Sequence, residues 1–411
     1  MGDNSKKPGI RFKGFTDDWE QRKLGDVAEF SKGSGYSKGD LVEYGTPIIL
    51  YGRLYTNYET RISDVDTFVE AKVGSVYSKG GEVIVPASGE TAEDIARAAT
   101  VDKSGILLGG DLNIVMPNKD INSSFLAISI SSGNPQRELA KKAQGKSVVH
   151  IHNEEIKNLV LPFPIKDEQN KIASYFCQLD NLITLHQRKY DKLVMSKKSM
   201  LEKMFPKNGQ TKPEIRFSGF IDDWEQRKLG DVAEFSKGSG YSKGDLVEYG
   251  TPIILYGRLY TNYETRISDV DTFVEAKVGS VYSKGGEVIV PASGETAEDI
   301  ARAATVDKSG ILLGGDLNIV MPNKDINSSF LAISISSGNP QRELAKKAQG
   351  KSVVHIHNEE IKNLVLPFPI KDEQNKIASY FCQLDNLITL HQRELEKLKK
   401  IKLSMLEKMF V

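Results

Sequence analysis

The stretch LPFPIKDEQNKIASYFCQLDNLITLHQR occupies residues 161–188 and recurs without change at residues 366–393. After Pro162 and Pro164, which suit the end of an extended strand, the chain has no glycine or proline until Pro206. Its apolar residues alternate at spacings of four and three: Ile172, Phe176, Leu179 and Ile183, copied as Ile377, Phe381, Leu384 and Ile388. This spacing predicts a long helix in each copy, with a seam that calls for a partner helix.

The helix closes a much longer repeat. Residues 17–188 recur letter for letter as residues 222–393, a segment of 172 residues at an offset of 205. Identity across loops as well as core residues indicates a recent duplication, a recombination between two cassettes or an engineered fusion, and the sequence does not separate these origins. The chain therefore holds two globular units of roughly 150 to 170 residues, each large enough for its own core.

The first part of each repeat consists of short apolar runs punctuated by glycine, which predict strands separated by turns. In the first copy these runs are KLGDVAEF (23–30), TPIILYGRL (46–54), SVYSKGGEVIVPAS (75–88), GILLGGDLNIVMP (105–117) and SVVHIHNEEIKNLVLPFP (147–164). One helical interval, SSFLAISISSGNPQRELAKKA (123–143), is expected to break at Asn134 and Pro135. We therefore expect an α/β fold of the mixed α+β kind, with strands dominating each globular part.

The two long helices are expected to lie antiparallel as a coiled coil that separates two β-rich domains, with an internal pseudo-two-fold. About 37 helical residues would give a spacer on the order of 55 Å. The alternative is that each helix folds back on its own domain. The expected boundaries are an N-terminal tail (1–16), a first domain (17–164), a spacer helix (165–205), a linker (206–216), a second domain (217–369) and a second spacer helix (370–411).

Composition limits the class of protein. Lys and Arg total 55 and Asp and Glu total 55, so any basic surface for nucleic acid must be local. The only cysteines, Cys177 and Cys382, favour a reducing compartment and exclude a disulfide framework. No apolar run reaches the roughly 20 residues that span a bilayer, and the opening MGDNSKKPG is no secretory signal. We expect a soluble, cytoplasmic protein with no membrane contact.

Each motif that would indicate an enzyme lacks a residue or a structural setting that its chemistry requires. The string AQGKS (143–147) lacks the first glycine of a phosphate-binding loop, which is Ala140 here, and follows a helical pattern instead of a strand. His150 and His152 share one strand face, but a metal site needs three or four ligands, so no metal is expected. No glycine-rich turn forms a dinucleotide site. We expect a binding protein without catalytic residues.

Polar loops beside the strand ends carry the residues expected to bind. They mix lysine, arginine and tyrosine with serine and histidine, which suits a nucleic acid, because lysines and backbone amides hold phosphates while arginine and serine can read base edges. A short helix after Ser88 and Gly89 is expected to be capped by Thr91, which leaves Ser88 and Glu90 free to face a ligand. The alternative is that these are solvated loops of a β-rich domain.

Taken together, the repeat and its motifs resemble the specificity subunit of type I restriction-modification systems. Each half opens with RFxGFxDDWEQRKLGDVAEF, continues through PIILYGRL and EVIVPASGETAEDIARAA, and ends in QGKSVVHIHNEEIKNLVLPFP before the helix that contains EQ. The resemblance covers the chain apart from its first residues and the linker. It implies a non-catalytic subunit in which two target recognition domains read DNA and the helices fix the gap between half-sites.

The resemblance also implies partners. These are double-stranded DNA, two modification subunits that bring S-adenosylmethionine and methylate one adenine in each half-site, and, where present, two restriction subunits that use ATP and Mg. No cofactor is expected on this chain, and no N-P-P-Y or D-P-P-Y string of an amino-methyltransferase occurs. The polar seam positions Tyr190 and Lys197 are interpreted as a docking place for modification subunits, with a merely solvated face as the alternative.

Usual family members carry two different domains, whereas the two domains here are identical. Related by a two-fold, they would read the same sequence on opposite strands, so the expected target is an interrupted palindrome. With a rod on the order of 55 Å, the centres of the two half-sites lie no more than about 16 base pairs apart. A protein-interaction rod and a stand-alone methyltransferase are the alternatives. The expected DNA contacts are Lys32, Ser34, Tyr36, Arg53, Tyr55, Ser88, Glu90, Lys146, Ser147 and His150, with the copies Lys237, Ser239, Tyr241, Arg258, Tyr260, Ser293, Glu295, Lys351, Ser352 and His355.

Overall fold

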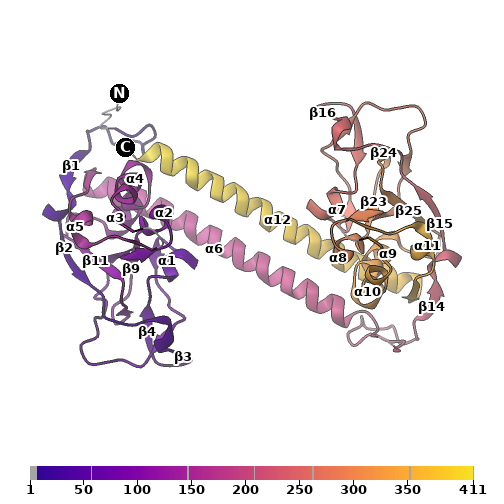
Figure 1. Ribbon diagram of the computed structural model, residues 1–411, viewed down its shortest axis with the longest axis horizontal. Coiled ribbons are helices and arrows are strands. Elements are labelled where there is room, and N and C mark those ends of the chain that lie inside the picture. Colours follow the sequence, from indigo (N-terminus) through magenta and orange to yellow (C-terminus); the bar gives the residue numbers. More distant parts are fainter. Residues whose placement is uncertain are drawn as a thin grey trace. The chain divides into compact units, whose positions relative to one another are not determined.

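A computed structural model describes residues 7–56, 58–145, 148–207, 209–261, 263–350 and 353–410 (Figure 1). The chain divides into two compact units: unit 1 is Met1–Gln187 with Arg393–Val411, and unit 2 is Arg188–Gln392. Each unit holds one β-rich domain, the first part of the long helix that follows it, and the last part of the other long helix. The division therefore passes through both long helices and not between the two repeats.

The centre of unit 1 is a five-stranded sheet in the order β2-β11-β7-β9-β5. Its strands are β2 (Ala28–Lys32), β11 (Leu112–Pro117), β7 (Glu82–Pro86), β9 (Ala99–Val101) and β5 (Arg61–Ile62). The strand β7 is buried along its whole length and pairs antiparallel with both neighbours. Val83 and Val85 join one hydrophobic cluster and Ile84 joins another, because successive side chains on a strand point to opposite faces.

A second sheet and two short ribbons complete the strands of this domain. The second sheet has the order β10 (Leu107–Leu108), β4 (Thr46–Ile49), β6 (Phe68–Val69) and β3 (Leu41–Val42). One ribbon pairs β1 (Glu20–Lys23) with β13 (Val160–Phe163), and the other pairs β8 (Ser88–Gly89) with β12 (Val149–His150). The helices are α1 (Arg53–Thr56), α2 (Ala92–Ile95), α3 (Ser123–Ile130), α4 (Gly133–Lys141) and α5 (Asn153–Lys157), with 3-10 turns at Leu24–Asp26 and Lys38–Asp40.

The structure corrects the predicted helical interval and one predicted strand. α3 ends at Ile130 and α4 begins at Gly133, so the prediction of a break at Asn134 and Pro135 is wrong. Pro135 lies in the first turn of α4, where a missing N–H costs no helical hydrogen bond. The apolar run at residues 147–164 is not one strand, because α5 separates β12 from β13.

Unit 2 repeats this architecture with the copied residues, except that β20 adds a fifth strand to its second sheet (Figure 1). Its strands are β14 (Glu225–Lys228), β15 (Ala233–Lys237), β16 (Leu246–Val247), β17 (Thr251–Ile254), β18 (Arg266–Ile267), β19 (Phe273–Val274), β20 (Tyr282–Lys284), β21 (Glu287–Pro291), β22 (Ser293–Gly294), β23 (Ala304–Val306), β24 (Ser309–Leu313), β25 (Leu317–Pro322), β26 (Val354–His355) and β27 (Val365–Phe368). Its short helices are α7 (Arg258–Thr261), α8 (Ala297–Ile300), α9 (Ser328–Ile335), α10 (Gly338–Lys346) and α11 (Asn358–Lys362), with 3-10 turns at Leu229–Asp231 and Lys243–Asp245. The central sheet again has five strands, in the order β15-β25-β21-β23-β18.

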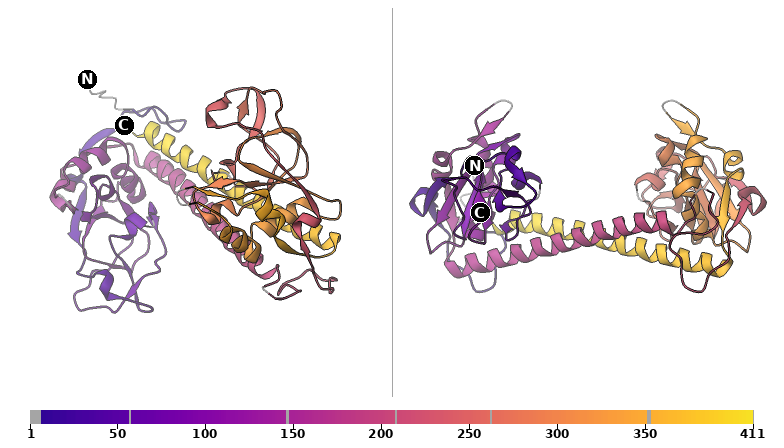
Figure 2. Two further views of the ribbon diagram at one scale, coloured as in Figure 1. Left: turned by 45° about the vertical axis from the view of Figure 1, so that its right-hand side comes forward. Right: turned by 90° about the horizontal axis from the view of Figure 1, so that it is seen from below.

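The two long helices are α6 (Lys166–Lys203) and α12 (Lys371–Met409), with 38 and 39 residues. In unit 1, Phe176 of α6 lies 6.0 Å from Phe410 between ring centroids, and Asp180 pairs with Lys402 of α12. Residue numbers thus rise along one helix as they fall along the other. The matching pairs in unit 2 are Phe381 with Phe205 and Asp385 with Lys197. The predicted antiparallel pairing is confirmed within each unit, where the helices lie side by side (Figure 2).

The apolar seam predicted on each long helix packs against a β-rich domain and against the other long helix. Ile172, Phe176 and Leu179 are buried in the same cluster as Trp19 and Phe125 of the β-rich domain, and Met409 of α12 joins that cluster. Ile183 and its copy Ile388 are half-buried, and Ile377, Phe381 and Leu384 are buried in the corresponding cluster of unit 2. Each long helix therefore begins against its own domain and pairs there with the end of the other helix. Within the described part of the chain, no helix is long and apolar enough to cross a membrane.

Candidate nucleic-acid interface

A hollow of about 740 Å³ in unit 1 collects several of the predicted binding residues. Its walls come from the turn after β2, from α1, from β8 and from the turn before β11. Among the residues that line it are Tyr36, Lys38, Tyr51, Tyr55, Ser88, Glu90, Asp94 and Asp111. Unit 2 has a corresponding hollow of about 700 Å³, lined among others by Tyr241, Lys243, Tyr256, Arg258 and Asp316. Four predicted residues of unit 1 thus meet in one place: Tyr36, Tyr55, Ser88 and Glu90.

Tyr55 and His150 hold the β8 wall of the hollow. The Tyr55 hydroxyl donates to the backbone carbonyl of Ser88, and burial raises the pKa of this hydroxyl, which keeps it a donor. The Ser88 Oγ lies 3.1 Å from His150 Nδ1, across the ribbon in which the two residues pair. A Cβ on Gly89 would lie 3.0 Å from the Tyr55 hydroxyl and 3.3 Å from the Ile95 Cβ, closer than ordinary contact, so glycine suits this close approach.

Tyr36 lies beneath a charged pair. The tyrosine is buried, its hydroxyl lies 2.6 Å from the Ser75 Oγ, and it accepts a hydrogen bond from the Lys72 backbone N–H. The Lys72 ammonium lies 4.7 Å from the centre of the Tyr36 ring and pairs with the Asp40 carboxylate. This hydrogen bond lowers the pKa of Asp40 to about 2. The turn is therefore fixed by its own contacts at neutral pH.

Lys32 and Ser34 do not line the hollow. Lys32 is exposed at the end of β2. The Ser34 Oγ accepts from the Val76 backbone N–H at 3.1 Å and lies 3.4 Å from the Leu108 carbonyl oxygen, so this hydroxyl is engaged inside the domain. Glu90 and His150 are exposed.

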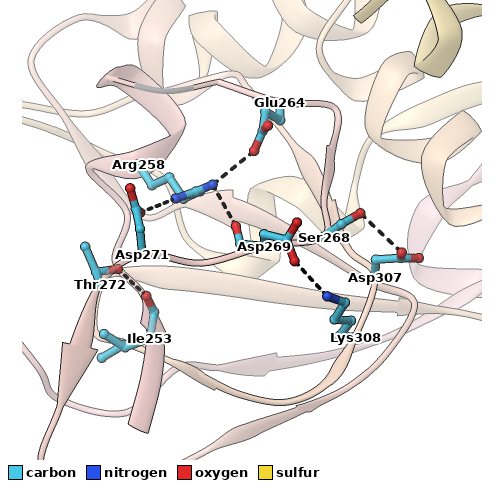
Figure 3. A network of polar contacts seen from close by, with 9 residues as sticks. All are labelled: Ile253, Arg258, Glu264, Ser268, Asp269, Asp271, Thr272, Asp307 and Lys308. Atoms are coloured by element: carbon cyan, nitrogen blue, oxygen red, sulfur yellow. Dashed lines mark hydrogen bonds and ion pairs between the residues drawn. The ribbon is translucent and has the colours of Figure 1, made fainter. Parts of the chain in front are cut away.

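Arg53 lies in an internal network. Its Nη2 donates to Glu59 Oε2 at 2.9 Å and to the Asp64 backbone carbonyl at 3.0 Å, while Nη1 donates to Asp66 Oδ1 at 3.0 Å. The Arg53 side chain is 12% exposed. Figure 3 shows the same arrangement around the copied arginine, with the residues Arg258, Glu264, Asp269 and Asp271. The role of Arg53 in reading a base stays a prediction, and it would require a base to replace these carboxylates.

The remaining candidates complete the comparison with the sequence. Lys146, Ser147, Lys351 and Ser352 lie outside the described residues. The copies in unit 2 hold equivalent positions: Lys237, Ser239, Tyr241, Arg258, Tyr260, Ser293, Glu295 and His355. Thr91 caps α2 as expected, since its Oγ1 accepts from the Asp94 backbone N–H at 3.1 Å.

Asp111 is a residue of the hollow that the sequence prediction missed. Its φ is 57°, and in the described residues it shares a positive φ outside glycine only with its copy Asp316. Aspartate tolerates this left-handed conformation better than most residues, and the Asp111 backbone carbonyl accepts from the Ala87 N–H at 2.7 Å. The sequence signal at this position is GGD between two apolar runs, a pattern that indicates a turn but not a binding residue.

The polar character of the hollow is mixed. Asp94 pairs with Arg97 at 2.9 Å. The carboxylates of Glu90 and Asp111 form no side-chain hydrogen bond or ion pair with the described residues, and both residues are exposed. Lys38 contributes a cation to the same lining. The hollow thus offers tyrosine rings, two available carboxylates and one ammonium group, a set that suits the edge of a base better than a phosphate alone.

Comparisons with known proteins identify the family of this chain. The family model of the type I restriction modification DNA specificity domain matches residues 16–195 and again residues 221–400. The chain therefore belongs to the family of type I restriction-modification DNA specificity domains and carries that domain twice. This family is defined by DNA specificity, so the chain is a recognition protein of such a system and not its catalytic component.

Individual relatives extend over nearly the whole chain. The type I restriction enzyme MjaVIII specificity subunit of Methanocaldococcus jannaschii is 24% identical and covers 94% of this chain and 90% of its own length. The putative type I restriction enzyme MjaX specificity subunit of the same organism is 24% identical, with coverages of 94% and 91%. The crystal structure of the type I restriction-modification S subunit from M. genitalium has a TM-score of 0.63 at 15% identity, covering 98% of this chain and 99% of that one. That likeness shows a shared fold.

Proposed function

We propose that each unit reads one half of a bipartite DNA site and that both halves have the same sequence. The observation that carries the proposal is the repetition of one reading surface: residues 17–188 and 222–393 are identical, and both units form the hollow beside α1 or α7. Two identical surfaces recognise the same bases. If the two readings run in opposite directions, the target is an interrupted palindrome.

The chemistry of the hollow supports a class of base contact. A carboxylate accepts hydrogen bonds, and in the major groove the amino groups of cytosine and adenine donate them. Glu90 and Asp111 supply such acceptors beside the tyrosines of unit 1, and Asp316 does so in the hollow of unit 2. We therefore infer that each half-site places a cytosine or adenine amino group against this surface.

We propose, as the resemblance to the family implies, that the long helices set the separation of the half-sites. α6 and α12 are continuous helices of 38 and 39 residues, each on the order of 57 Å long at about 1.5 Å per residue. We expect one spacer length and not a range.

The family also indicates the partners. We propose that the chain recruits two modification subunits, which carry S-adenosylmethionine and methylate one adenine in each half-site. Restriction subunits with ATP and Mg would join the same complex where the system contains them. The chain itself would contribute recognition and spacing.

Methylome sequencing tests the proposal in a host that expresses this chain with a cognate modification subunit. The expected result is an interrupted palindrome with one methylated adenine in each half and a single spacer length. An asymmetric motif would show that the identical domains are used unequally and would contradict the palindrome.

A second measurement separates DNA recognition from a role as a protein-interaction rod. Neutralising several phosphates makes binding steeply salt-dependent, so log K against log salt is expected to fall with a slope of about −0.9 for each phosphate contacted. A flat response, together with no methylated motif, would favour the protein-interaction rod.

A further inference from the structure

Beyond the half-site reading proposed above, on which this inference rests, we propose that Asp180 and Lys402 are positioning residues. They join the segment that carries α1 and Thr60, here called the reading segment of unit 1, to both long helices. Asp385 and Lys197 do the same for the copied segment in unit 2. Neither residue of the pair lines the hollow, so they act through the segment that does.

Three elements meet at the Asp180 carboxylate. Asp180 lies on α6, and its Oδ1 pairs with the Lys402 ammonium of α12. Its Oδ2 accepts a hydrogen bond from the Thr60 hydroxyl at 2.6 Å. Thr60 directly precedes β5, so one carboxylate ties a strand of the β-rich domain to two helices.

The junction is shielded from solvent. The side chains of Lys402 and Asp180 are 20% and 19% exposed, and Thr60 is buried. The Lys402 ammonium also lies 5.7 Å from the centre of the Tyr58 ring, a cation–π contact. Partial removal from water strengthens such contacts and makes an unpaired charge costly, so the three groups fix one another's positions.

A short path of contacts leads from this junction to the hollow. Glu59, next to Thr60, accepts a hydrogen bond from Arg53 at the start of α1. The same α1 carries Tyr55, which lines the hollow and holds the β8 wall. A change at Asp180 would therefore reach the reading surface through Thr60, Glu59 and α1.

Unit 2 builds the same junction with a lysine from the other helix. Lys197 of α6 pairs with Asp385 of α12, and the Asp385 Oδ2 accepts from Thr265 at 2.5 Å. The side chains of Lys197 and Asp385 are both 18% exposed. Lys197 also lies 5.7 Å from the ring centre of Tyr263. This contact explains why a lysine occupies one of the polar seam positions.

The pair also selects one register of the helices. A slip of α12 by one heptad would put Leu395 or Met409 opposite Asp180 and leave its carboxylate without a cation. Each reading segment is thus completed by a lysine that belongs to the helix of the other repeat. The proposal is that correct reading in each unit requires the helices to be paired in this register.

Hydrogen exchange of the full-length chain tests this coupling without DNA. The Thr100 N–H donates to the Thr60 carbonyl at 2.8 Å, so a peptide covering residues 98–103 reports on the junction. Its copy at residues 303–308 has the same sequence, and one mass spectrum therefore reports both units. In the wild-type chain we expect a single isotope envelope.

Lys402→Met should split this envelope into two of equal intensity, because only unit 1 loses its cation. The affected envelope should exchange about tenfold faster, and Lys197→Met should give the same pattern from unit 2. The double variant should return to one envelope at the faster rate. Lys402→Arg keeps the charge and should behave as wild type, while Lys400→Met, an exposed lysine of the same helix, is the matched control.

A functional measurement completes the test. The ratio of binding to a duplex with the mapped motif over a scrambled duplex should fall about tenfold in Lys402→Met, with non-specific binding unchanged. An unsplit envelope, or faster exchange throughout the β7 core, would overturn the positioning role. So would a split envelope with an unchanged specificity ratio. If the wild-type chain prefers no duplex, the proposed reading of DNA fails, whereas the exchange pattern still decides whether the junction exists.

Discussion

The two repeats differ most where the two long helices have left the identical segment. Residues 17–188 and 222–393 are the same, but residues 189–198 read KYDKLVMSKK while residues 394–403 read ELEKLKKIKL. Identity then resumes as SMLEKMF at residues 199–205 and 404–410. Contacts with the β-rich domains explain part of this pattern.

The residues retained in the variable segment are mostly those with a partner. Lys197 and Lys402 make the junction with aspartate, and Leu193 and Leu398 pack against the hydrophobic clusters of the units they enter. Met195 and Lys400 occupy the same position of the two helices, differ in residue type and are both exposed. Lys192 is retained as Lys397, and nothing in the structure explains it. The retained lysines and leucines thus make the same contacts in both units, whereas Ile401, which packs against the cluster of unit 1, is replaced by Ser196 in the other helix.

The largest expected effect comes from the ends of the helices. Phe205 packs against Trp224, Phe330 and Phe381, and Phe410 packs against the corresponding rings of unit 1. Phe205→Ala should destabilise unit 2 by about 3 to 5 kcal/mol, because a buried aromatic side chain is removed. Phe410→Ala should do the same to unit 1.

Denaturant unfolding followed by tryptophan fluorescence measures this effect. The chain has two tryptophans, one in each unit, so Trp19→Phe or Trp224→Phe isolates the signal of one unit. Met195→Ala, at a side chain that is 72% exposed, is the control and should change little. If Phe205→Ala lowered the free energy of unfolding equally in both units, this result would contradict the division into separate cores.

A smaller effect is expected at the arginine beside the hollow. If Arg53 reads a guanine bidentately, Arg53→Ala should cost about 1 to 3 kcal/mol of discrimination and relax the motif at one position. Arg258→Ala should have the same effect, and the two losses should add. Competition binding to duplexes with and without that base measures it.

Arg61→Ala is the matched control, because that arginine pairs with Asp102 on the surface. Unequal losses from Arg53→Ala and Arg258→Ala would show that identical domains are used differently. An even loss of affinity across all sequences would instead assign the arginine to a phosphate contact or to the internal network.

The smallest effect concerns acid titration of the two copied turns. Lys72 lowers the pKa of Asp40 from 3.8 to about 2, and Lys277 lowers that of Asp245 equally. A lowered folded-state pKa stabilises the protein above the unfolded-state value, and that contribution is lost as the pH falls through the folded-state value. No change is therefore expected between pH 7 and about pH 4, with the loss between about pH 4 and 2.

Carboxyl-carbon NMR measures both titrations in one sample. Lys72→Met should raise the pKa of Asp40 alone, and Lys277→Met should raise that of Asp245 alone. Two different titrations in the wild-type chain would contradict the equivalence of the two turns.

Much of this architecture follows from local sequence. The repeat, the long helices and the family motifs are visible in spacing and composition, and the seam at Ile172, Phe176 and Leu179 is buried as expected. The helix α5 was missed because NEEIK is short and lies between two apolar runs. Periodicity over five residues does not separate a single helical turn from a loop.

The binding surface was less predictable. Tyr36, Tyr55, Ser88 and Glu90 do share a hollow, but Arg53 is held by carboxylates that follow it by 6 and 13 residues. The contact between Asp180 and Lys402 spans 222 residues, and no local pattern reports it. Contacts of this range depend on the tertiary fold, which a single sequence does not encode in any short window.

The chain segments that make up each unit also bear on the order in which the units are completed. Unit 2 is one unbroken stretch, Arg188–Gln392, whereas unit 1 needs Arg393–Val411 to complete its core. During synthesis the first β-rich domain is made first, yet the side chain of Phe410, which contacts Trp19, is made after all of unit 2. We therefore expect unit 1 to be completed after unit 2, the reverse of the usual order in which N-terminal domains finish first. Until Phe410 has been synthesised, the aromatic cluster around Trp19 lacks one of its rings.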